Sequence, residues 1–289
     1  MSHTGPDSRS RPPTSEAATT REQERSVLER HRVLWRKKPA LSRVYAVWFE
    51  RLLADIPHGE RVLEVGAGPG FFSQHAHSAR PDLSWLASDY LFVPGNQLVA
   101  DALHLPLRDA SVGAVVGCDI LHHLVQPGSF LSESARVLRP GGTLVLLEPW
   151  MTHLSYPVYR FMHHEDCHSP VDIWRPFDVD SSGSKLAFDG NSAIPWSMIR
   201  RLTTEDWRQL GLQAPQVTLC NAFAYLLSLG FRNGNLLPSL TLARALMLLD
   251  RWLQPAAGWL GMRATLRWLK SPAATSAAAP VHPRAVAGR

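Results

Sequence analysis

Apolar and polar positions follow one period before residue 56 and a different one just after residue 60. From Arg21 to Ile56 the apolar residues recur at spacings near three and four, which is the period of an amphipathic helix. Pro39 interrupts the pattern, so we expect one or two helices that pack in front of a sheet. Residues 61–65 are a short run with β-branched side chains, which predicts a buried strand.

A glycine-rich turn at 66–70 follows this strand at once, and residues 71–80 then have a helical pattern that Pro81 ends. Strand, glycine turn and helix form the first half of a βαβ unit. Glycines let the backbone adopt positive φ and approach a ligand closely, and the free N–H groups at a helix start favour an anionic or polar group. We therefore expect a nucleoside-containing cofactor at the mouth of a parallel sheet.

Beyond residue 80, short apolar runs alternate with helical segments. The apolar runs predict strands at 83–87, 114–118, 143–147, 216–219 and 264–269. A helix is expected at 129–138, and another begins near residue 203, where a threonine cap precedes acidic residues. This alternation is typical of an open α/β sheet.

Residues 223–262 are unusually apolar, and Arg244, Asp250 and Arg251 interrupt them. This pattern fits an amphipathic helical insert better than a membrane-spanning segment. We favour a hydrophobic cap that closes a substrate pocket. A surface that meets a membrane or a lipid-linked substrate is the alternative, and both interpretations stay open.

Both ends of the chain have the composition of disordered segments, Pro/Ser/Thr-rich at the start and Ala/Pro-rich at the end. We divide the chain into a disordered tail (1–20), an N-terminal helical segment (21–60), a sheet domain (61–272) and a second tail (273–289). Within the sheet domain we expect a substrate loop at 150–200 and the apolar insert at 222–262.

Charge and cysteine content narrow the class of protein. The 289 residues carry a formal charge of +5, but the arginines are scattered, so a nucleic-acid partner is not expected. Three widely spaced cysteines argue against a disulfide framework and favour a reducing compartment. The first residues lack an apolar signal region, and no run of 18 apolar residues occurs, so we expect a cytoplasmic protein.

Polar residues stand at the ends of two predicted strands, where a parallel sheet binds its ligands. Asp89 is placed to accept hydrogen bonds from ribose hydroxyls, with a turn-satisfying aspartate as the alternative. Asp119, His122 and His123 follow the strand at 114–118. Only one of two adjacent histidines easily faces the crevice. The alternative is that one packs and the other bonds a backbone carbonyl.

Four blocks between residues 61 and 149 resemble the class I S-adenosylmethionine (SAM) dependent methyltransferases. Glu64 precedes a Gly-x-Gly-x-Gly turn, and Phe71 stands where a dinucleotide fingerprint has its third glycine. Residues 99–107 and 111–116 resemble the "D-A-x-x-L-P-F … S-F-D" block of the methyltransferase domain 11 group, although Gly113 replaces the usual aspartate. The group often has "L-H-H" after this block, and residues 135–149 match its "A-R-V-L-R-P-G-G-T-L-V-L-L-E-P".

The resemblance implies a Rossmann-like, doubly wound sheet of seven strands whose last strand is antiparallel, with SAM as cofactor. In this family the positions of Asp101 and the N–H of Ala102 read the adenine edge. The cofactor-binding residues that it implies are Glu64, Gly66, Ala67, Gly68, Gly70, Asp89, Asp101, Ala102 and Asp119.

A bound SAM carries an activated methyl group, so the protein must hold a nucleophile in line and exclude water. An oxygen or nitrogen nucleophile benefits from a general base, for which our hypothesis is His122 or His123. His163, His164 and Glu165 are second-rank candidates from a loop above the site.

The stretch 159–168 also invites a metal interpretation, because histidines, acids and a cysteine lie close together in it. Neighbouring residues on an extended stretch point to opposite faces, so one short stretch rarely supplies three ligands. A polar loop over the active site is therefore favoured, and no metal ligand is predicted.

These observations predict a SAM-dependent methyltransferase with a small-molecule or lipid-linked acceptor, hydrophobic or glycan in nature. Two alternatives stay open. A nicotinamide-dependent oxidoreductase is disfavoured by the glycine spacing and by the block at Asp101 and Ala102. A non-catalytic SAM-binding scaffold remains the other. If the membrane alternative holds, the insert at 222–262 is where the protein contacts the inner face of a membrane.

Overall fold

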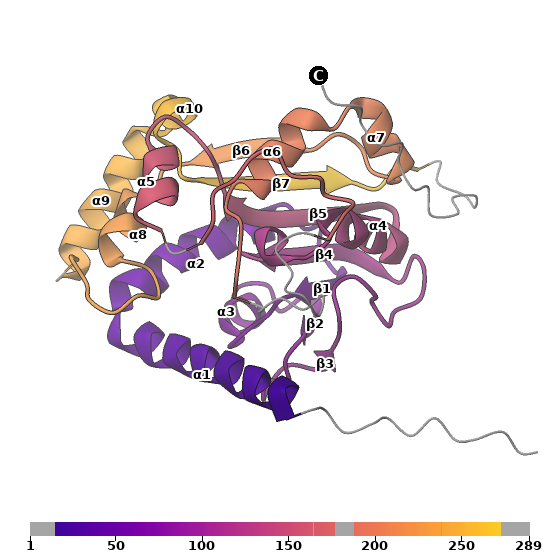
Figure 1. The fold of residues 1–289 in the computed structure, drawn as a ribbon, viewed down its shortest axis with the longest axis horizontal. Coiled ribbons are helices and arrows are strands. Elements are labelled where there is room, and N and C mark those ends of the chain that lie inside the picture. Colours follow the sequence, from indigo (N-terminus) through magenta and orange to yellow (C-terminus); the bar gives the residue numbers. More distant parts are fainter. Residues whose placement is uncertain (1–14, 164, 177–187, 238, 273–289) are drawn as a thin grey trace, which may run out of the picture.

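The computed structural model describes residues 15–163, 165–176, 188–237 and 239–272, with residues 15–21 by their backbone only. The described chain builds one sheet with helices on both faces (Figure 1). Its seven strands follow the order β3-β2-β1-β4-β5-β7-β6. They are β1 Arg61–Val65, β2 Ser84–Asp89, β3 Leu98–Val99, β4 Val112–Cys118, β5 Leu138–Pro149, β6 Gln216–Cys220 and β7 Arg263–Leu269.

The strand pairing confirms the predicted fold class. β7 runs antiparallel to both β5 and β6, and the other pairings are parallel. From β1 the chain moves outward to β2 and β3 and then returns to β4 on the other side of β1. The strand order therefore reverses between β1 and β4, which is where an open α/β sheet binds its ligand. Only β3 has no counterpart among the predicted strands.

Alternate strand residues face two separate cores. Leu63, Val115 and Leu146 belong to one core, where α4 (Pro127–Val137), α6 (Ile194–Arg201) and α7 (Thr204–Gln209) cover the sheet. Val62, Val116 and Leu147 belong to the other, beneath α2 (Pro39–Ala54) and α3 (Phe71–Ala79). Because side chains alternate along a strand, β1, β4 and β5 are apolar on both faces, and this explains their continuous apolar runs.

The N-terminal helices are present, but they begin earlier than expected. Helix α1 spans Ser15–Lys37 and α2 follows with Pro39 at its first turn, so the predicted break at this proline is confirmed. The tail boundary at residue 20 was wrong, because residues 15–20 continue the helix. The stretch contains Glu and Ala, which are good helix formers. The rest of the first tail and the predicted tail at 273–289 lie outside the described residues.

The insert before the last strand is helical, as predicted. It contains α8 (Phe223–Ser228), α9 (Leu240–Trp252), the short turn η2 (Gln254–Ala256) and α10 (Ala257–Leu260). Helices α8 and α9 pack against each other and against α2 (Figure 1). Among the described helices, none combines the length and the hydropathy that crossing a bilayer requires.

One buried lysine joins the N-terminal helices to this insert. Lys38 lies between α1 and α2, and its Nζ donates to the carbonyl oxygens of Ser228, Gly230 and Arg232 at 2.9, 2.8 and 2.6 Å. Burial lowers the pKa of the ammonium. The three bonds fix the segment after α8 to the junction of the two N-terminal helices.

Candidate functional site

The glycine turn after β1 has the backbone that the sequence predicts. Gly66, Gly68 and Gly70 have φ values of 69°, 50° and 82°. A Cβ at Gly66 would lie 2.7 Å from Cδ1 of Ile120, so a larger residue here needs a strained backbone and a shift of the Ile120 side chain. The turn leads directly into α3, whose first N–H groups lie at the switch point of the sheet.

Helix α1 lies over this turn. Cδ2 of Leu28 is 3.7 Å from the position that a Cβ on Gly68 would take. The same leucine packs against Leu91 and Val93. Further along α1, the ring of Trp35 stacks on Phe71 with a centroid distance of 4.0 Å. Trp35 thus covers the start of α3.

Asp89, at the end of β2, bonds the glycine turn. Its Oδ2 accepts from the N–H of Gly68 at 2.8 Å, and its Oδ1 accepts from the N–H of Leu91 at 2.9 Å. Burial raises the pKa of this carboxyl group, and the two N–H donors oppose the rise. These two bonds are the ones expected if Asp89 satisfies the backbone of a turn, which was the alternative to ribose binding. Each oxygen keeps a second lone pair, so contact with a ribose stays a prediction.

Three other predicted cofactor residues are Glu64, which precedes the turn in the sequence, and Asp101 and Ala102, which follow it. Glu64 is buried on β1 and accepts a 2.8 Å hydrogen bond from Nε1 of Trp85. Asp101 is exposed, and its Oδ1 accepts from the N–H of Leu103 at 2.9 Å. Ala102 is buried beside it. Their contacts with a cofactor remain predictions.

Asp119 marks the end of β4 and has a positive φ of 58°. Its Oδ2 accepts a 3.2 Å hydrogen bond from Oη of Tyr45, and its Oδ1 pairs with the guanidinium of Arg263. Arg263 is buried and lies 5.1 Å above the ring of Trp48. The carboxylate therefore joins β4 to α2 and β7. Sequence reasoning missed Arg263, because an arginine at the start of a strand has no distinguishing pattern.

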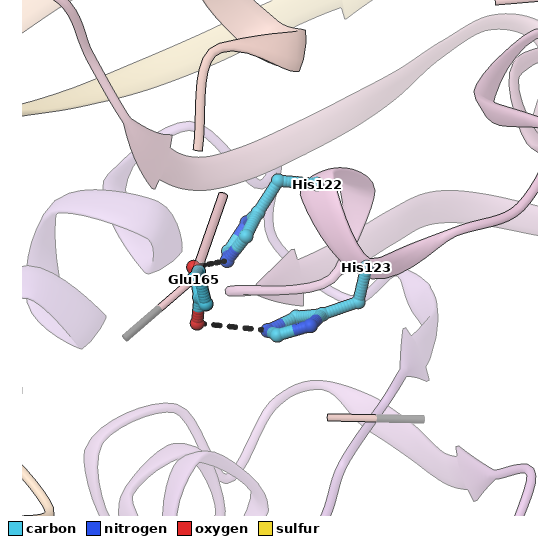
Figure 2. A group of neighbouring side chains, drawn as sticks. All are labelled: His122, His123 and Glu165. Carbon is cyan, nitrogen blue, oxygen red and sulfur yellow. Dashed lines mark ion pairs between the residues drawn. The ribbon is translucent and has the colours of Figure 1, made fainter. Parts of the chain in front are cut away.

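His122 is buried in the 3-10 turn η1 (Leu121–His123) that follows β4. Its Nδ1 lies 2.5 Å from Oε2 of Glu148, at the end of β5. The other oxygen of Glu148 accepts from the N–H groups of Ile120 and Leu121 at 3.0 and 2.8 Å. Nε2 of His122 lies 3.3 Å from Oε2 of Glu165 (Figure 2).

His123 approaches the other oxygen of the same carboxylate (Figure 2). Its Nε2 lies 3.7 Å from Oε1 of Glu165, and its Nδ1 donates to the carbonyl oxygen of Asp189 at 3.1 Å. The two imidazole rings are 4.1 Å apart. Both adjacent histidines reach one carboxylate because a tight 3-10 turn presents them. His122 is buried and His123 bonds a backbone carbonyl, which are the contacts of the alternative left open by the sequence. A role of either histidine as general base stays a prediction.

Charges within this group shift its ionisation strongly. Burial alone would lower the pKa of His122, but Glu165 and Glu148 raise it overall. Burial and the charge of His122 lower the pKa of His123. Burial would raise the pKa of Glu165, but the neighbouring histidines hold it well below its usual range. The three groups therefore behave as one electrostatic unit.

Glu165 comes from the stretch at 159–168, whose first residues end helix α5 (Ser155–Phe161) and do not form the predicted loop. His163 of this stretch lies beside Glu165, with its Nδ1 3.6 Å from Oε2, and other members lie elsewhere. The side chains of Asp166 and His168 are 57% and 61% exposed, whereas Cys167 packs in a small core with Met151. His164 lies outside the described residues. The loop thus contributes one carboxylate above the histidine pair, to which sequence reasoning had given only second rank.

Residues 63–146 match the family model described as "Methyltransferase domain". The match covers the glycine turn, β2, β4, the histidine pair and most of β5. Residues 63–146 of this chain are therefore a methyltransferase domain, as in the SAM-dependent methyltransferases that the sequence resembles. This finding confirms the predicted family over the nicotinamide-dependent alternative.

Relatives of this methyltransferase chain match it over less than half of its length. A demethylmenaquinone methyltransferase of Paenarthrobacter aurescens is 31% identical over 121 residues, which are 38% of this chain and 46% of the relative. An uncharacterized protein encoded in a transposon of Streptomyces fradiae is 29% identical over 157 residues, which are 49% of this chain and 46% of that protein. The chain thus spans less than half the length of these two relatives.

A solved structure supports the fold over a longer stretch. The SAM-dependent methyltransferase of Archaeoglobus fulgidus superposes with a TM-score of 0.51 at 16% sequence identity. The match covers 82% of this chain and 98% of that one. At this identity the likeness supports the arrangement of strands and helices and nothing finer.

Proposed function

We propose that this protein binds SAM at the glycine turn and transfers a methyl group to a small-molecule acceptor over the carboxyl ends of β4 and β5. The observation that carries the proposal is the turn itself. Gly66, Gly68 and Gly70 all have positive φ, lie inside the matched methyltransferase domain and stand where the strand order reverses.

The residues around the turn fit the parts of such a cofactor. Asp89 has lone pairs that can accept from ribose hydroxyls, and it holds the turn through Gly68. Asp101 and Ala102 follow β3 and are the candidate adenine contacts. Asp119 stands at the tip of β4 on the far side of the turn. When bound, SAM supplies a methyl group on a positively charged sulfur, so no further activation of the donor is required.

The chain's own contribution is to hold the acceptor, exclude water and assist loss of its proton. Of the two predicted bases we favour His123 for proton removal, because its lowered pKa keeps the ring neutral, whereas Glu165 and Glu148 raise the pKa of His122 and keep that ring protonated. The position of the two histidines just past β4 puts them on the ligand side of the sheet. Helix α1 and the aromatic contact of Trp35 with Phe71 cover the cofactor side.

A hydrophobic or lipid-linked acceptor is our more specific proposal. Helix α9 and the segment after it expose large apolar side chains, namely Leu240, Leu242, Leu248, Leu249, Trp252 and Trp259. This face fits contact with a lipid surface or with the apolar carrier of an acceptor. Sedimentation with phosphatidylcholine vesicles tests the contact. We expect Trp252→Ser to reduce the bound fraction, and equal sedimentation of both proteins would contradict it.

Calorimetric titration tests the cofactor. We expect SAM and S-adenosylhomocysteine to bind with micromolar affinity and NADH not to bind. Asp101→Ala should weaken binding about tenfold, the effect of losing one hydrogen bond to a polar ligand. Asp109→Ala, at an exposed carboxylate farther along the same segment, is the matched control. NADH binding, or no binding of either SAM compound, would overturn the proposal.

A further inference from the structure

The cluster of His122, His123 and Glu165 offers three donor groups to one point (Figure 2). One ligand atom from each residue lies within 4.8 Å of the other two. We propose that this His–His–Glu cluster binds a divalent transition-metal ion through the two Nε2 atoms and the carboxylate of Glu165. Two imidazoles and one carboxylate favour zinc, cobalt(II) or iron(II) over magnesium or calcium.

Hydrogen bonds on the far side of each ring leave the required lone pairs available. The carbonyl oxygen of Asp189 can only accept, so Nδ1 of His123 carries the hydrogen and Nε2 is left to coordinate. Nδ1 of His122 faces Glu148 in the same way. A carboxylate or carbonyl behind a histidine ligand is the usual outer support of a metal site, because it fixes the ring and its tautomer.

Charge balance supports a cation at this point. Glu148 and Glu165 place two carboxylates on either side of His122, with side chains 0% and 8% exposed. Buried charges are costly unless a countercharge lies close to them. A protonated His122 offsets one of the two negative charges, whereas a divalent ion offsets both.

The distances need little adjustment. Nε2 of His122 and Nε2 of His123 lie 3.3 and 3.7 Å from the nearer oxygens of Glu165. Ligand atoms at 2.0–2.1 Å from a tetrahedral zinc ion are about 3.3 Å apart. The two nitrogen–oxygen distances are therefore close to those of a tetrahedral site, and all three donor atoms lie within 4.8 Å of one another.

The loop that carries Glu165 is fixed in place. Oγ of Ser192 donates to its Oε2 at 3.0 Å, and the N–H of Asp166 donates to the carbonyl oxygen of Gly190 at 3.0 Å. A Cβ at Gly190 would lie 3.0 Å from the His123 ring and 3.1 Å from the Glu165 carboxyl. A glycine there lets the backbone close over the cluster.

Three protein ligands leave at least one coordination position for another molecule, as in catalytic metal sites. The cluster stands past the carboxyl ends of β4 and β5, the edge at which an open α/β sheet binds its ligand. This part of the inference rests on the proposed function: an acceptor hydroxyl bound there would lose its proton more easily, since a cation stabilises the resulting oxygen anion. The metal site itself does not depend on methyl transfer.

Cobalt(II) binding tests the site on the whole chain after dialysis against a chelator. We expect one cobalt(II) per chain with visible absorption bands of low-symmetry coordination, and competition by zinc. His123→Ala and Glu165→Gln should each weaken binding at least tenfold, and Glu148→Gln, which leaves the ligands intact, about 10–100-fold. His168→Ala is the matched control, because this exposed histidine of the same loop lies outside the cluster.

A second measurement, the effect of zinc on the melting temperature, tests the metal site even if one variant is less stable than the original protein. Zinc should raise the melting temperature of the original protein and of His168→Ala, but not that of Glu165→Gln, whose side chain keeps its volume. Absence of stoichiometric cobalt from the original protein, or equal affinity in all variants, would overturn the proposal and leave a buried ion-pair network. SAM titration of the metal-free protein is independent, so failure of the metal site and failure of the proposed function are distinguishable.

Discussion

Trp85 donates a 2.8 Å hydrogen bond from Nε1 to Oε2 of Glu64, and both side chains lie on the face of the sheet that α3 covers. Burial raises the pKa of Glu64 to about 7, while the Trp85 bond acts in the opposite direction. Below about pH 4.5 the group is protonated in both folded and unfolded chains. Between that pH and about 7 only the folded chain keeps the proton, so stability falls as pH rises through this window.

Glu64→Gln should remove this pH dependence. The neutral amide keeps an acceptor for Trp85 and carries no charge to bury. Relative to the original protein, we expect the variant to gain about 3 kcal/mol in the free energy of unfolding between pH 4.5 and pH 8. Urea unfolding at both pH values measures the gain, and an unchanged difference between the proteins would contradict it.

Gly66→Ala should destabilise the glycine turn by two separable effects. Positive φ costs a residue with a Cβ about 1–2 kcal/mol, and the contact with Ile120 adds about 1–3 kcal/mol. Gly59→Ala is the matched control, since Gly59 has a φ of 72° and nothing within 4 Å of its Cβ position. Equal losses of unfolding free energy in the two variants would show that the Ile120 contact costs nothing.

Arg263→Met should cost about 3 kcal/mol of stability, because Asp119 then loses its buried countercharge. Since Asp119 is one-quarter exposed, the loss should lie at the low end for buried pairs. Adding Asp119→Asn should recover part of it. Arg139→Met, which removes an exposed partner of Glu60, should cost less than about 1 kcal/mol. Chemical denaturation of the four proteins distinguishes these values, and equal costs at both arginines would contradict the assignment.

Lys38→Met should loosen the segment after α8. Three carbonyl acceptors lose their donor, at a cost of about 1–3 kcal/mol in local stability. Amide hydrogen exchange should therefore quicken at 228–237, with the sheet amides unaffected. Lys37→Met is the control, because the neighbouring side chain is exposed. Unchanged exchange in the segment would mean that the lysine does not hold it.

Local patterns were enough to predict most of the sheet. β1, β4 and β5 are apolar on both faces, so each appeared as a continuous run in the sequence. The two-residue strand β3 has no such signal, because its position depends on pairing with the end of β2. The start of α1 was predicted six residues too late, because the Ser and Thr residues of its first turns resemble the composition of a tail.

The site was predicted in part. Adjacent histidines after a strand were visible in the sequence, but Glu165 is 42 residues away from His123 and reaches it only through the packing of a loop. The role of Glu148 was equally hidden. A glutamate that ends a strand shows no sign of the histidine that it supports from the neighbouring strand. Long-range contacts of this kind follow from tertiary packing and not from sequence spacing.

Lys38 has one more consequence for how the helices move together. It joins α1, which covers Gly68 through Leu28, to the segment after α8. Movement of α1 away from the glycine turn also displaces the Lys38 ammonium, whose hydrogen bonds hold the segment after α8 in the apolar insert. The helix that covers the glycine turn and the apolar insert are therefore fixed to each other, and a displacement of one is passed to the other through these bonds.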